Sequence, residues 1–238
     1  MIGTSAAQMT QCSVVTVSFP LAGKQLPADH GFLLYAAITR AMPHLHKQDW
    51  LAIELISGLP VGRGLVLLPE RDATLRLRVT ADHYRDALPL SGKRLDIGGH
   101  PIRLGLPLVR ALEPTPSLYA RVVTIKKFTE GEPFLDAVKR KLDQFGIKAR
   151  VELPRDEQGR YRRRIVTIHG KSVVGFSVAL HELSNEDSIL LQSGVVNETA
   201  SESGSMKWRS IFSRRAMGCG IFNPIKRNIP VVDEYGTN

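Results

Sequence analysis

The sequence has few cysteines, and this scarcity excludes several kinds of site. Cys12 and Cys219 are the only cysteines among 238 residues, and neither belongs to a Cys-x-x-Cys or His-x-x-x-His spacing. Two isolated thiols cannot assemble a zinc site, so we expect no metal ion and no other cofactor. Without a disulfide framework, the expected location is the reducing cytoplasm.

Long apolar runs and aromatic residues are also scarce. No stretch is long enough to cross a bilayer, and the first residues lack the pattern of a signal peptide, so a membrane is not an expected partner. Aromatic residues make up 6% of the chain, and neither half has the aromatic-rich strands that stack single-stranded bases. Any bound RNA is therefore expected to be held mainly through its phosphates and grooves.

Positive charge is what the sequence has in excess. The formal net charge is +9, which favours a polyanionic partner, with nucleic acid ahead of an anionic membrane. Residues 1–117 carry 12 Lys/Arg against 9 Asp/Glu, and residues 118–238 carry 20 against 14, so the second half contributes +6 of the +9. A generally basic soluble protein is the alternative explanation of the charge.

The hydrophobic pattern predicts the same order of elements twice. In the first half, Asp29 and Thr80 are expected to cap the two helices, and a linker follows at residues 113–116. The predicted strands are 13–19, 51–56, 62–68, 73–79, 94–97 and 102–112, and the predicted helices are 29–41 and 81–88. In the second half, the predicted strands are 118–125, 147–153, 162–168, 172–180 and 221–225, and the predicted helices are 132–145 and 184–192, with Ser184 as a cap.

This order predicts an α+β fold with tandem ferredoxin-like (RRM-like, βαββαβ) domains. The expected domains are residues 12–113 and residues 117–227, the second with a Gly-rich loop, and 228–238 is a tail. Residues 195–213 interrupt the pattern with a Ser/Glu/Thr-rich stretch that is predicted to be a mobile insertion. Trp208 and Phe212 within it either pack against the rest of the protein, which we favour, or offer a stacking surface for an RNA base.

Two basic stretches are candidate RNA-binding sites. The first is a predicted hairpin that carries Arg160, Arg162, Arg163, Arg164 and Lys171, so that one of its faces is basic. The alternative is a solvated edge strand whose charge prevents aggregation. The second comprises Arg214, Arg215, Gly218 and Gly220, where glycines allow close approach of a backbone and amides with arginines can hold a phosphate. A simple tight turn is the alternative there.

Several of these stretches together resemble a known family, the CRISPR-associated repeat-RNA endoribonucleases. This is the sixth Cas family of the RAMP superfamily, and the resemblance is to its myxobacterial-type subgroup. The stretches that carry it run through nearly the whole chain in the family's order: residues 19–23, 26–31, 60–62, 90–100, 123–129, 169–176 and 214–222. Residues 194–213 depart from the family because they form a longer connection than is usual before its Gly-rich turn.

The resemblance implies an endonuclease that cleaves CRISPR precursor RNA within its repeats without a metal, and often keeps the product bound. The products would be a 2′,3′-cyclic phosphate and a 5′-hydroxyl. The expected partner is a CRISPR repeat RNA hairpin, with other Cas effector subunits as further possible partners. Two other hypotheses stay open: a non-catalytic RNA-binding subunit of a CRISPR effector complex, and an unrelated RNA-binding protein with the same fold.

His30 is the preferred catalytic residue, as general base or acid. Metal-independent RNA cleavage needs two proton transfers, and histidine suits both because its unperturbed pKa is about 6.5. His30 lies in the first turn of the first predicted helix, where the helix dipole disfavours the imidazolium. The family's catalytic histidine usually belongs to this region. A capping or packing role is the alternative.

Tyr35 is the second catalytic candidate, although it is a poor partner for His30. It follows His30 by five residues, which is roughly 140° around a helix, so it is expected in the core or across the cleft. His44 and His46 follow the same helix with a spacing that indicates no obvious site. His169 precedes Gly170 in a predicted tight turn beside the basic hairpin, where it could contact RNA.

Overall fold

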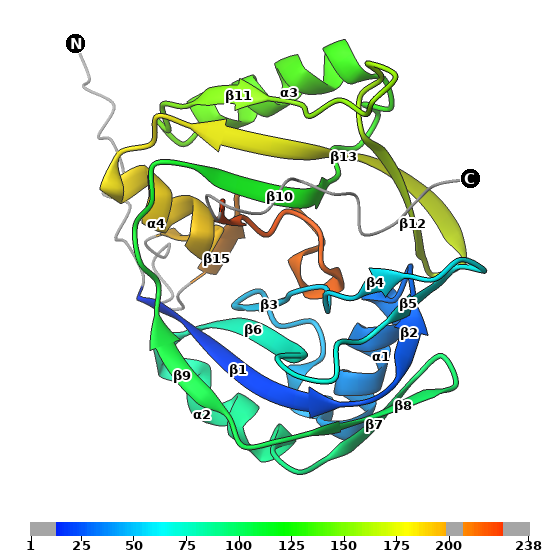
Figure 1. Ribbon diagram of the computed structural model, residues 1–238. Coiled ribbons are helices and arrows are strands. Elements are labelled where there is room, and N and C mark those ends of the chain that lie inside the picture. Colours follow the sequence, from blue (N-terminus) through cyan, green and yellow to red (C-terminus); the bar gives the residue numbers. More distant parts are fainter. Residues whose placement is uncertain (1–12, 199–206, 226–238) are drawn as a thin grey trace.

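The computed structural model describes residues 13–198 and 207–225, and these form two halves that face each other (Figure 1). The N-terminal half builds one large sheet and the C-terminal half builds a second. Each sheet has its own hydrophobic core. The domain limits at 12–113 and 117–227 stay predictions, and the predicted tail 228–238 lies outside the described residues.

The N-terminal sheet has the strand order β3-β6-β1-β8-β7, and β9 also pairs with β1. Its buried face follows from strict alternation along the strands, since the cross-strand pairs Val17–Leu77 and Phe19–Leu75 are fully buried. The strands are β1 (Val14–Ala22), β3 (Leu51–Ile53), β6 (Thr74–Thr80), β7 (Arg94–Ile97), β8 (His100–Leu104) and β9 (Leu108–Ala111).

Two helical segments cover this sheet. Helix α1 (Gly31–Ala41) buries Leu34 and Ile38, which lie four residues apart and so share one helical face. The second segment is shorter than predicted, with α2 (Tyr84–Ala87) flanked by the 3-10 turns η2 (Ala81–His83) and η3 (Leu88–Leu90). After α1 the chain folds back through the 3-10 turn η1 (Pro43–Leu45).

The C-terminal sheet has the strand order β11-β13-β10-β16, and β12 also pairs with β13. Phe134 and Val138 of α3 are fully buried against it, as the predicted inner face of that helix requires. The elements are β10 (Leu118–Val123), α3 (Gly131–Asp143), β11 (Arg150–Glu152), β12 (Arg163–Ile168), β13 (Lys171–His181), α4 (Asn185–Ser193) and β16 (Asn223–Pro224).

The two sheets share one arrangement of strands. In each, the first and third strands of the unit are neighbours, as β1 and β6 are in the first sheet and β10 and β13 in the second. The second strand pairs with the other edge of the third strand, and the last strand pairs with the other edge of the first. Helices follow the first and third strands, which is the βαββαβ order. The predicted ferredoxin-like fold is therefore confirmed.

Two small sheets complete the described residues. One joins β2 (Gln25–Pro27), β5 (Leu65–Leu67) and β4 (Leu59–Pro60), and the other pairs β14 (Val195–Glu198) with β15 (Lys207–Ser210). The second small sheet forms both ends of the segment predicted as a mobile insertion, whose middle, residues 199–206, lies outside the described residues. Trp208 packs against the N-terminal core and Phe212 is buried in the C-terminal core, which agrees with the favoured packing hypothesis.

The caps of the helices differ from prediction at two of three positions. Ser184 does cap α4, because its Oγ accepts a hydrogen bond from the Asp187 N–H at 3.0 Å. The cap position of α1 is His30 rather than Asp29, and Thr80 makes no side-chain capping bond. The Asp29 carboxylate instead accepts a hydrogen bond from the Thr167 N–H at 2.6 Å, so a contact between the halves has replaced the local cap.

A two-stranded arm connects the halves on one side of the molecule. The arm consists of residues 163–176, in which β12 and the start of β13 pair with each other from Arg163–Phe176 to Ile168–Lys171. It leaves the C-terminal sheet (Figure 1) and reaches the N-terminal half at Phe32 of α1, on which the His169 ring packs. Within the described residues, every helix is too short or too polar to cross a bilayer.

Candidate active site

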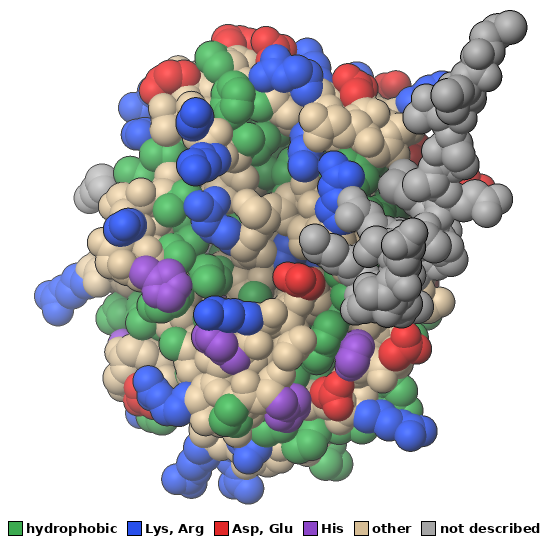
Figure 2. Space-filling view, turned by 180° about the vertical axis from the view of Figure 1, so that it is seen from behind, with side chains coloured by type: hydrophobic (Ala, Val, Ile, Leu, Met, Phe, Trp, Pro, Cys, Tyr) green, Lys and Arg blue, Asp and Glu red, His purple; other side chains and the backbone are tan. Residues whose placement is uncertain are grey.

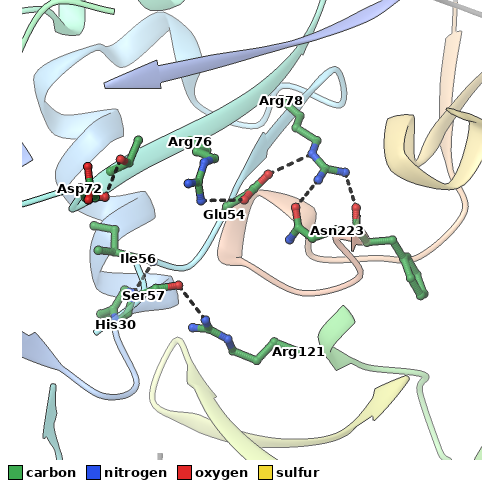
Figure 3. Close-up of polar contacts among 11 residues, drawn as sticks. His30, Glu54, Ile56, Ser57, Asp72, Arg76, Arg78, Arg121 and Asn223 are labelled. Carbon is green, nitrogen blue, oxygen red and sulfur yellow. Dashed lines mark hydrogen bonds and ion pairs between the residues drawn. The ribbon is translucent and has the colours of Figure 1, made fainter. Parts of the chain in front are cut away.

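His30 is held inside the protein by hydrogen bonds on both sides of its ring. Its Nδ1 lies 2.8 Å from the Pro27 carbonyl oxygen. Its Nε2 lies 3.0 Å from the Ile56 backbone nitrogen, a contact that Figure 3 shows. A carbonyl oxygen only accepts and an N–H only donates, so Nδ1 carries the ring proton and Nε2 is the acceptor. The ring is fully buried, although it forms part of the wall of a cavity of about 170 Å³ between α1 and the arm.

Burial keeps the His30 ring neutral. The pKa of His30 is lowered to about 4, mainly by burial and in part by the nearby Arg121 cation, against the raising effect of the Pro27 hydrogen bond. A neutral ring is what the sequence predicted, but the main cause is burial. In this arrangement the Nε2 lone pair is already used by the Ile56 N–H, so neither ring nitrogen is available to a substrate.

Tyr35 contacts a different histidine, which the sequence argument passed over. The Tyr35 hydroxyl lies 3.0 Å from Nδ1 of His46, and the two rings stack with centroids 5.8 Å apart. The Lys47 backbone N–H also donates to the Tyr35 hydroxyl oxygen, at 3.1 Å. Tyr35 is buried whereas His46 is exposed, so the tyrosine holds the histidine in place from the protein side.

The Tyr35–His46 pair lines a groove of about 430 Å³ along α1, named here the α1 groove. Arg40, one turn beyond Ala36 on α1, brings a cation to its wall. The groove combines a hydrogen-bonded histidine, a phenol and an arginine. The side chains that line it are Phe32, Tyr35, Ala36, Thr39, Arg40, Pro43, His46 and His169.

The arm closes one end of the α1 groove. His169, at the tip of the arm, packs its ring on Phe32 of α1 with centroids 4.5 Å apart. The Asp29–Thr167 hydrogen bond fixes the arm two residues before that tip. The C-terminal half therefore contributes a side chain to a groove built mainly by the N-terminal half.

The arm also carries most of the predicted basic residues at the surface. Arg163 and Lys171 are exposed, while Arg162 and Arg164 are partly buried, and Arg164 lines the smaller cavity beside His30. Arg160 precedes the arm, where its Nε donates to Asp156 at 2.9 Å. Figure 2 shows a band of Lys and Arg side chains on the side of the molecule that carries the arm, with histidines near its lower end.

The Gly-rich turn has an internal role in the structure. Gly218 and Gly220 adopt positive φ as predicted, but both are buried, and a side chain at Gly218 would collide with Leu55 of the N-terminal half. The Gly218 N–H donates to Arg215 O and the Gly220 N–H to Val122 O. These amides are therefore occupied by the protein, and the expected phosphate contact lacks free donors here.

The two arginines before the turn lie in different environments. Arg214 is partly exposed and donates to the Thr124 hydroxyl at 3.0 Å. Arg215, in the 3-10 turn η4 (Arg215–Met217), is 4% exposed and donates to the Ser193 carbonyl. The pKa of Arg215 is lowered to about 9, mainly by burial and in part by the neighbouring cation Arg78. Arg214 stays a candidate for RNA contact, whereas Arg215 lies too deep to reach it.

The sequence did not reveal a further contact between the halves, which residues 54–57 and β6 form. Glu54 accepts a hydrogen bond from buried Arg78, which also donates to the Phe222 carbonyl at 2.6 Å and to Asn223 (Figure 3). Ser57 accepts from Arg121 of β10 at 3.1 Å. The alternation of β6 placed Arg76 and Arg78 on one face, but nothing in it distinguished the exposed arginine from the buried one.

His46 is the residue of the α1 groove that sequence reasoning did not connect with Tyr35. It follows Tyr35 by eleven residues, which corresponds to no helical spacing, because the chain leaves α1 and turns back through η1. The usable signal was Pro43, which ends the helix and begins such a turn. Among the described residues, no group of three or more His, Cys, Asp or Glu side chains is placed to hold a metal ion.

Comparison with known proteins identifies relatives along nearly the whole chain. A family model described as Cas6 Crispr matches residues 15–227. A curated protein of Myxococcus xanthus (strain DK1622), named CRISPR-associated endonuclease Cas6, is 36% identical over 210 residues, which covers 88% of this chain and 81% of that protein.

Solved structures show the same fold at low sequence identity. One described as CRISPR associated protein Cas6 has a TM-score of 0.55 at 10% identity and covers 90% of this chain and 100% of its own. A Cas6-related protein from Pyrococcus furiosus has a TM-score of 0.53 at 13% identity, with 92% and 100% covered. A third, described as a RAMP protein binding different RNA substrates, has a TM-score of 0.51 at 13% identity, with 91% and 100% covered.

Proposed function

Because this chain belongs to the Cas6 family of CRISPR-associated endonucleases, we propose that it cleaves CRISPR precursor RNA within the repeats to release guide RNAs. The proposed cleavage needs no metal: the 2′-hydroxyl attacks the adjacent phosphorus, giving a 2′,3′-cyclic phosphate and a 5′-hydroxyl. The observation that carries the location of this chemistry is the Tyr35–His46 pair on the α1 groove.

His46 is assigned the role of general base. When Nδ1 carries the ring proton and donates to the Tyr35 oxygen, Nε2 keeps the lone pair that takes the 2′-hydroxyl proton. The Tyr35 oxygen has two lone pairs and can accept from both His46 and the Lys47 N–H. Tyr35 is thus a positioning residue that fixes the histidine's orientation. Arg40, on the same groove, supplies positive charge where the phosphorane develops negative charge.

The RNA is proposed to reach this groove along the arm. Arg163 and Lys171 are exposed on opposite faces of the arm, because Lys171 pairs with Ile168 and so shares its face with Arg164. Arg162 directly precedes the arm. A repeat hairpin held by its phosphates on these cations would bring its base to the α1 groove at the arm's tip. Arg214 extends the same basic surface, while Arg215, Gly218 and Gly220 are left out of it because they are buried.

His30, the catalytic residue that the sequence favoured, is the competing assignment. Its ring would have to release the Ile56 N–H before it could accept a proton from RNA. An exposed histidine with a free nitrogen fits the chemistry better than a buried one whose two nitrogens are occupied. The two assignments predict opposite results for the same pair of variants.

The decisive experiment is cleavage of a synthetic RNA that carries the repeat of the host's own CRISPR array, in EDTA and in Mg²⁺. We expect His46→Ala to cut about 10²–10⁴-fold more slowly than the wild type, because general base catalysis contributes that much, with RNA affinity nearly unchanged. His30→Gln, which keeps hydrogen-bonding capacity at this site, should retain cleavage as long as it folds.

Three outcomes would contradict parts of this proposal. Full activity of His46→Ala together with an inactive, folded His30→Gln would return the catalytic role to His30. Cleavage that requires Mg²⁺ would rule out the metal-independent mechanism. Tight binding of the repeat without any cleavage by the wild-type protein would favour a non-catalytic RNA-binding subunit.

A further inference from the structure

The tip of the arm holds a histidine in an uncommon backbone conformation. His169 has φ of 50° and Gly170 has φ of 72°, and the pairing of Ile168 with Lys171 leaves these two residues as the whole turn. Two-residue hairpin turns with positive φ at both positions most often carry Asn-Gly, although histidine is also enriched among the residues that adopt positive φ. The turn therefore tolerates histidine without requiring it, so the role of His169 is sought in what its ring contacts.

The His169 ring faces the site already described. It packs on Phe32, with ring centroids 4.5 Å apart, and it lines the α1 groove together with Tyr35 and His46. Phe32 and Tyr35 are three residues apart on α1, so their side chains are neighbours on one helical face. Two imidazoles, one from each half of the protein, therefore border the same groove. Among the described residues, none forms a hydrogen bond with the His169 ring.

The proposed reaction has a second proton transfer that no residue has yet been given. The attack of the 2′-oxygen breaks the bond between phosphorus and O5′, and an alkoxide is a poor leaving group unless it is protonated. Resting on the proposed function, we propose that His169 is the general acid of the cleavage. As the P–O5′ bond breaks, the His169 imidazolium gives its proton to O5′, while His46 takes the proton of the 2′-hydroxyl, so the number of protons is conserved.

A purely structural role of His169 is the alternative, and two matched variants separate its parts. His169→Asn keeps a residue that suits the turn but removes the aromatic ring. His169→Phe keeps a ring that can pack on Phe32 but cannot transfer a proton. If the turn alone matters, His169→Asn stays active, and if packing alone matters, His169→Phe stays active. Loss of activity in both folded variants points to the imidazole itself.

A substrate with a modified leaving group gives the sharper test. The wild-type protein is first used to map the bond it cuts in the repeat RNA, and O5′ at that bond is then replaced by sulfur. A thiolate leaves without protonation, so the general acid is no longer needed. We expect His169→Asn and His169→Phe to cut the ordinary RNA about 10²–10⁴-fold more slowly than the wild type. On the sulfur-containing RNA both should come within about tenfold of the wild type, whereas His46→Ala should stay slow.

Each other outcome has a definite meaning. If either His169 variant cuts ordinary RNA within about tenfold of the wild type, or if both are slow on both RNAs, His169 is not the general acid. In those cases the proposed function stands, because the wild-type protein still cuts the repeat. If the wild-type protein cuts neither RNA, the proposed function fails first, and this inference fails with it.

Discussion

Three histidines of this chain show how the environment of a residue decides its chemistry. His30 is fully buried with both ring nitrogens bonded to backbone groups, so it acts as part of the core. His46 is exposed and held by Tyr35, and His169 is exposed at the tip of the arm. By residue type alone, all three imidazoles are equally suited to proton transfer. They differ in what each ring nitrogen contacts.

The burial of His30 predicts a specific pH dependence of stability. Its pKa is about 4 in the folded protein and about 6.5 in the unfolded chain, so the unfolded chain binds more protons between these values. Stability from His30 is complete above pH 6.5 and is lost as the pH falls towards 4. The shift corresponds to roughly 3 kcal/mol of unfolding free energy over this window.

Urea denaturation between pH 7.5 and pH 4.5 measures this contribution. Relative to the wild type, His30→Gln should lose less stability on acidification, because it lacks the titrating ring. His44→Gln serves as the matched control, since His44 is exposed, and it should follow the wild-type curve. Parallel curves for all three proteins would contradict the burial of His30.

At the scale of elements, the structure separates the Gly-rich turn from the arm, although the sequence indicated both as candidate RNA-binding sites. The turn packs against the N-terminal half, where Met217 O lies so close to Gly31 that a side chain there would collide with it. The arm, in contrast, presents its cations to solvent and its tip to the α1 groove. Glycine served close packing between two parts of the protein rather than the approach of a ligand.

Because the Gly-rich turn is closely packed, a single methyl group added at Gly218 is expected to lower the stability of the protein. Gly218→Ala should destabilise the protein by about 2–4 kcal/mol, because positive φ is strained for alanine and the methyl group collides with Leu55. Gly99→Ala isolates the first effect, since Gly99 has φ of 84° and open space around it, and should cost only about 1–2 kcal/mol. Equal losses in chemical denaturation would show that the collision is relieved without cost.

At the scale of the whole molecule, one buried arginine joins the two sheets. Arg78 of β6 donates to Glu54 in its own half and to the carbonyl oxygens of Gln192 and Phe222 in the other. The proposed active site in the α1 groove depends on this contact, because His46 and His169 come from different halves and line one groove only when the halves keep their arrangement. Arg78 is thus a stabilising residue on which the geometry of the site depends.

Removing the Arg78 guanidinium should weaken the association of the two halves. Arg78→Met leaves Glu54 and two carbonyl oxygens buried without their main partner, so we expect a loss of roughly 3–5 kcal/mol. Arg76→Met is the control from the same strand face; its 3.9 Å ion pair with Glu54 is partly exposed and should contribute less than about 1 kcal/mol. Denaturation followed by tryptophan fluorescence would measure the loss of stability. Hydrogen exchange would show whether the two halves then unfold separately. Equal effects of the two variants would contradict the special role of Arg78.

The sequence predicted the elements well because their signals are local. Alternation along 73–79 and 162–168 gave β6 and β12, the periodicity of 132–145 gave α3, and Ser184 gave the cap of α4. The site prediction named Tyr35 of α1 as a candidate, but it paired the tyrosine with no histidine. His46 was passed over because the end of α1 and the turn η1 separate it from Tyr35 along the chain. Helical periodicity identifies neighbours only within one helix.

By itself, the sequence determined the βαββαβ order of each half, the family and the basic character of the arm, since these depend on residue types and their spacing. Only the tertiary structure decided which arginines are buried, which glycines are packed and that His30 has both ring nitrogens bonded to the backbone. Those properties depend on what lies opposite each residue when the two sheets meet. The contacts that decide them join residues as far apart as Arg78 and Phe222, and no local pattern in the chain records such a pairing.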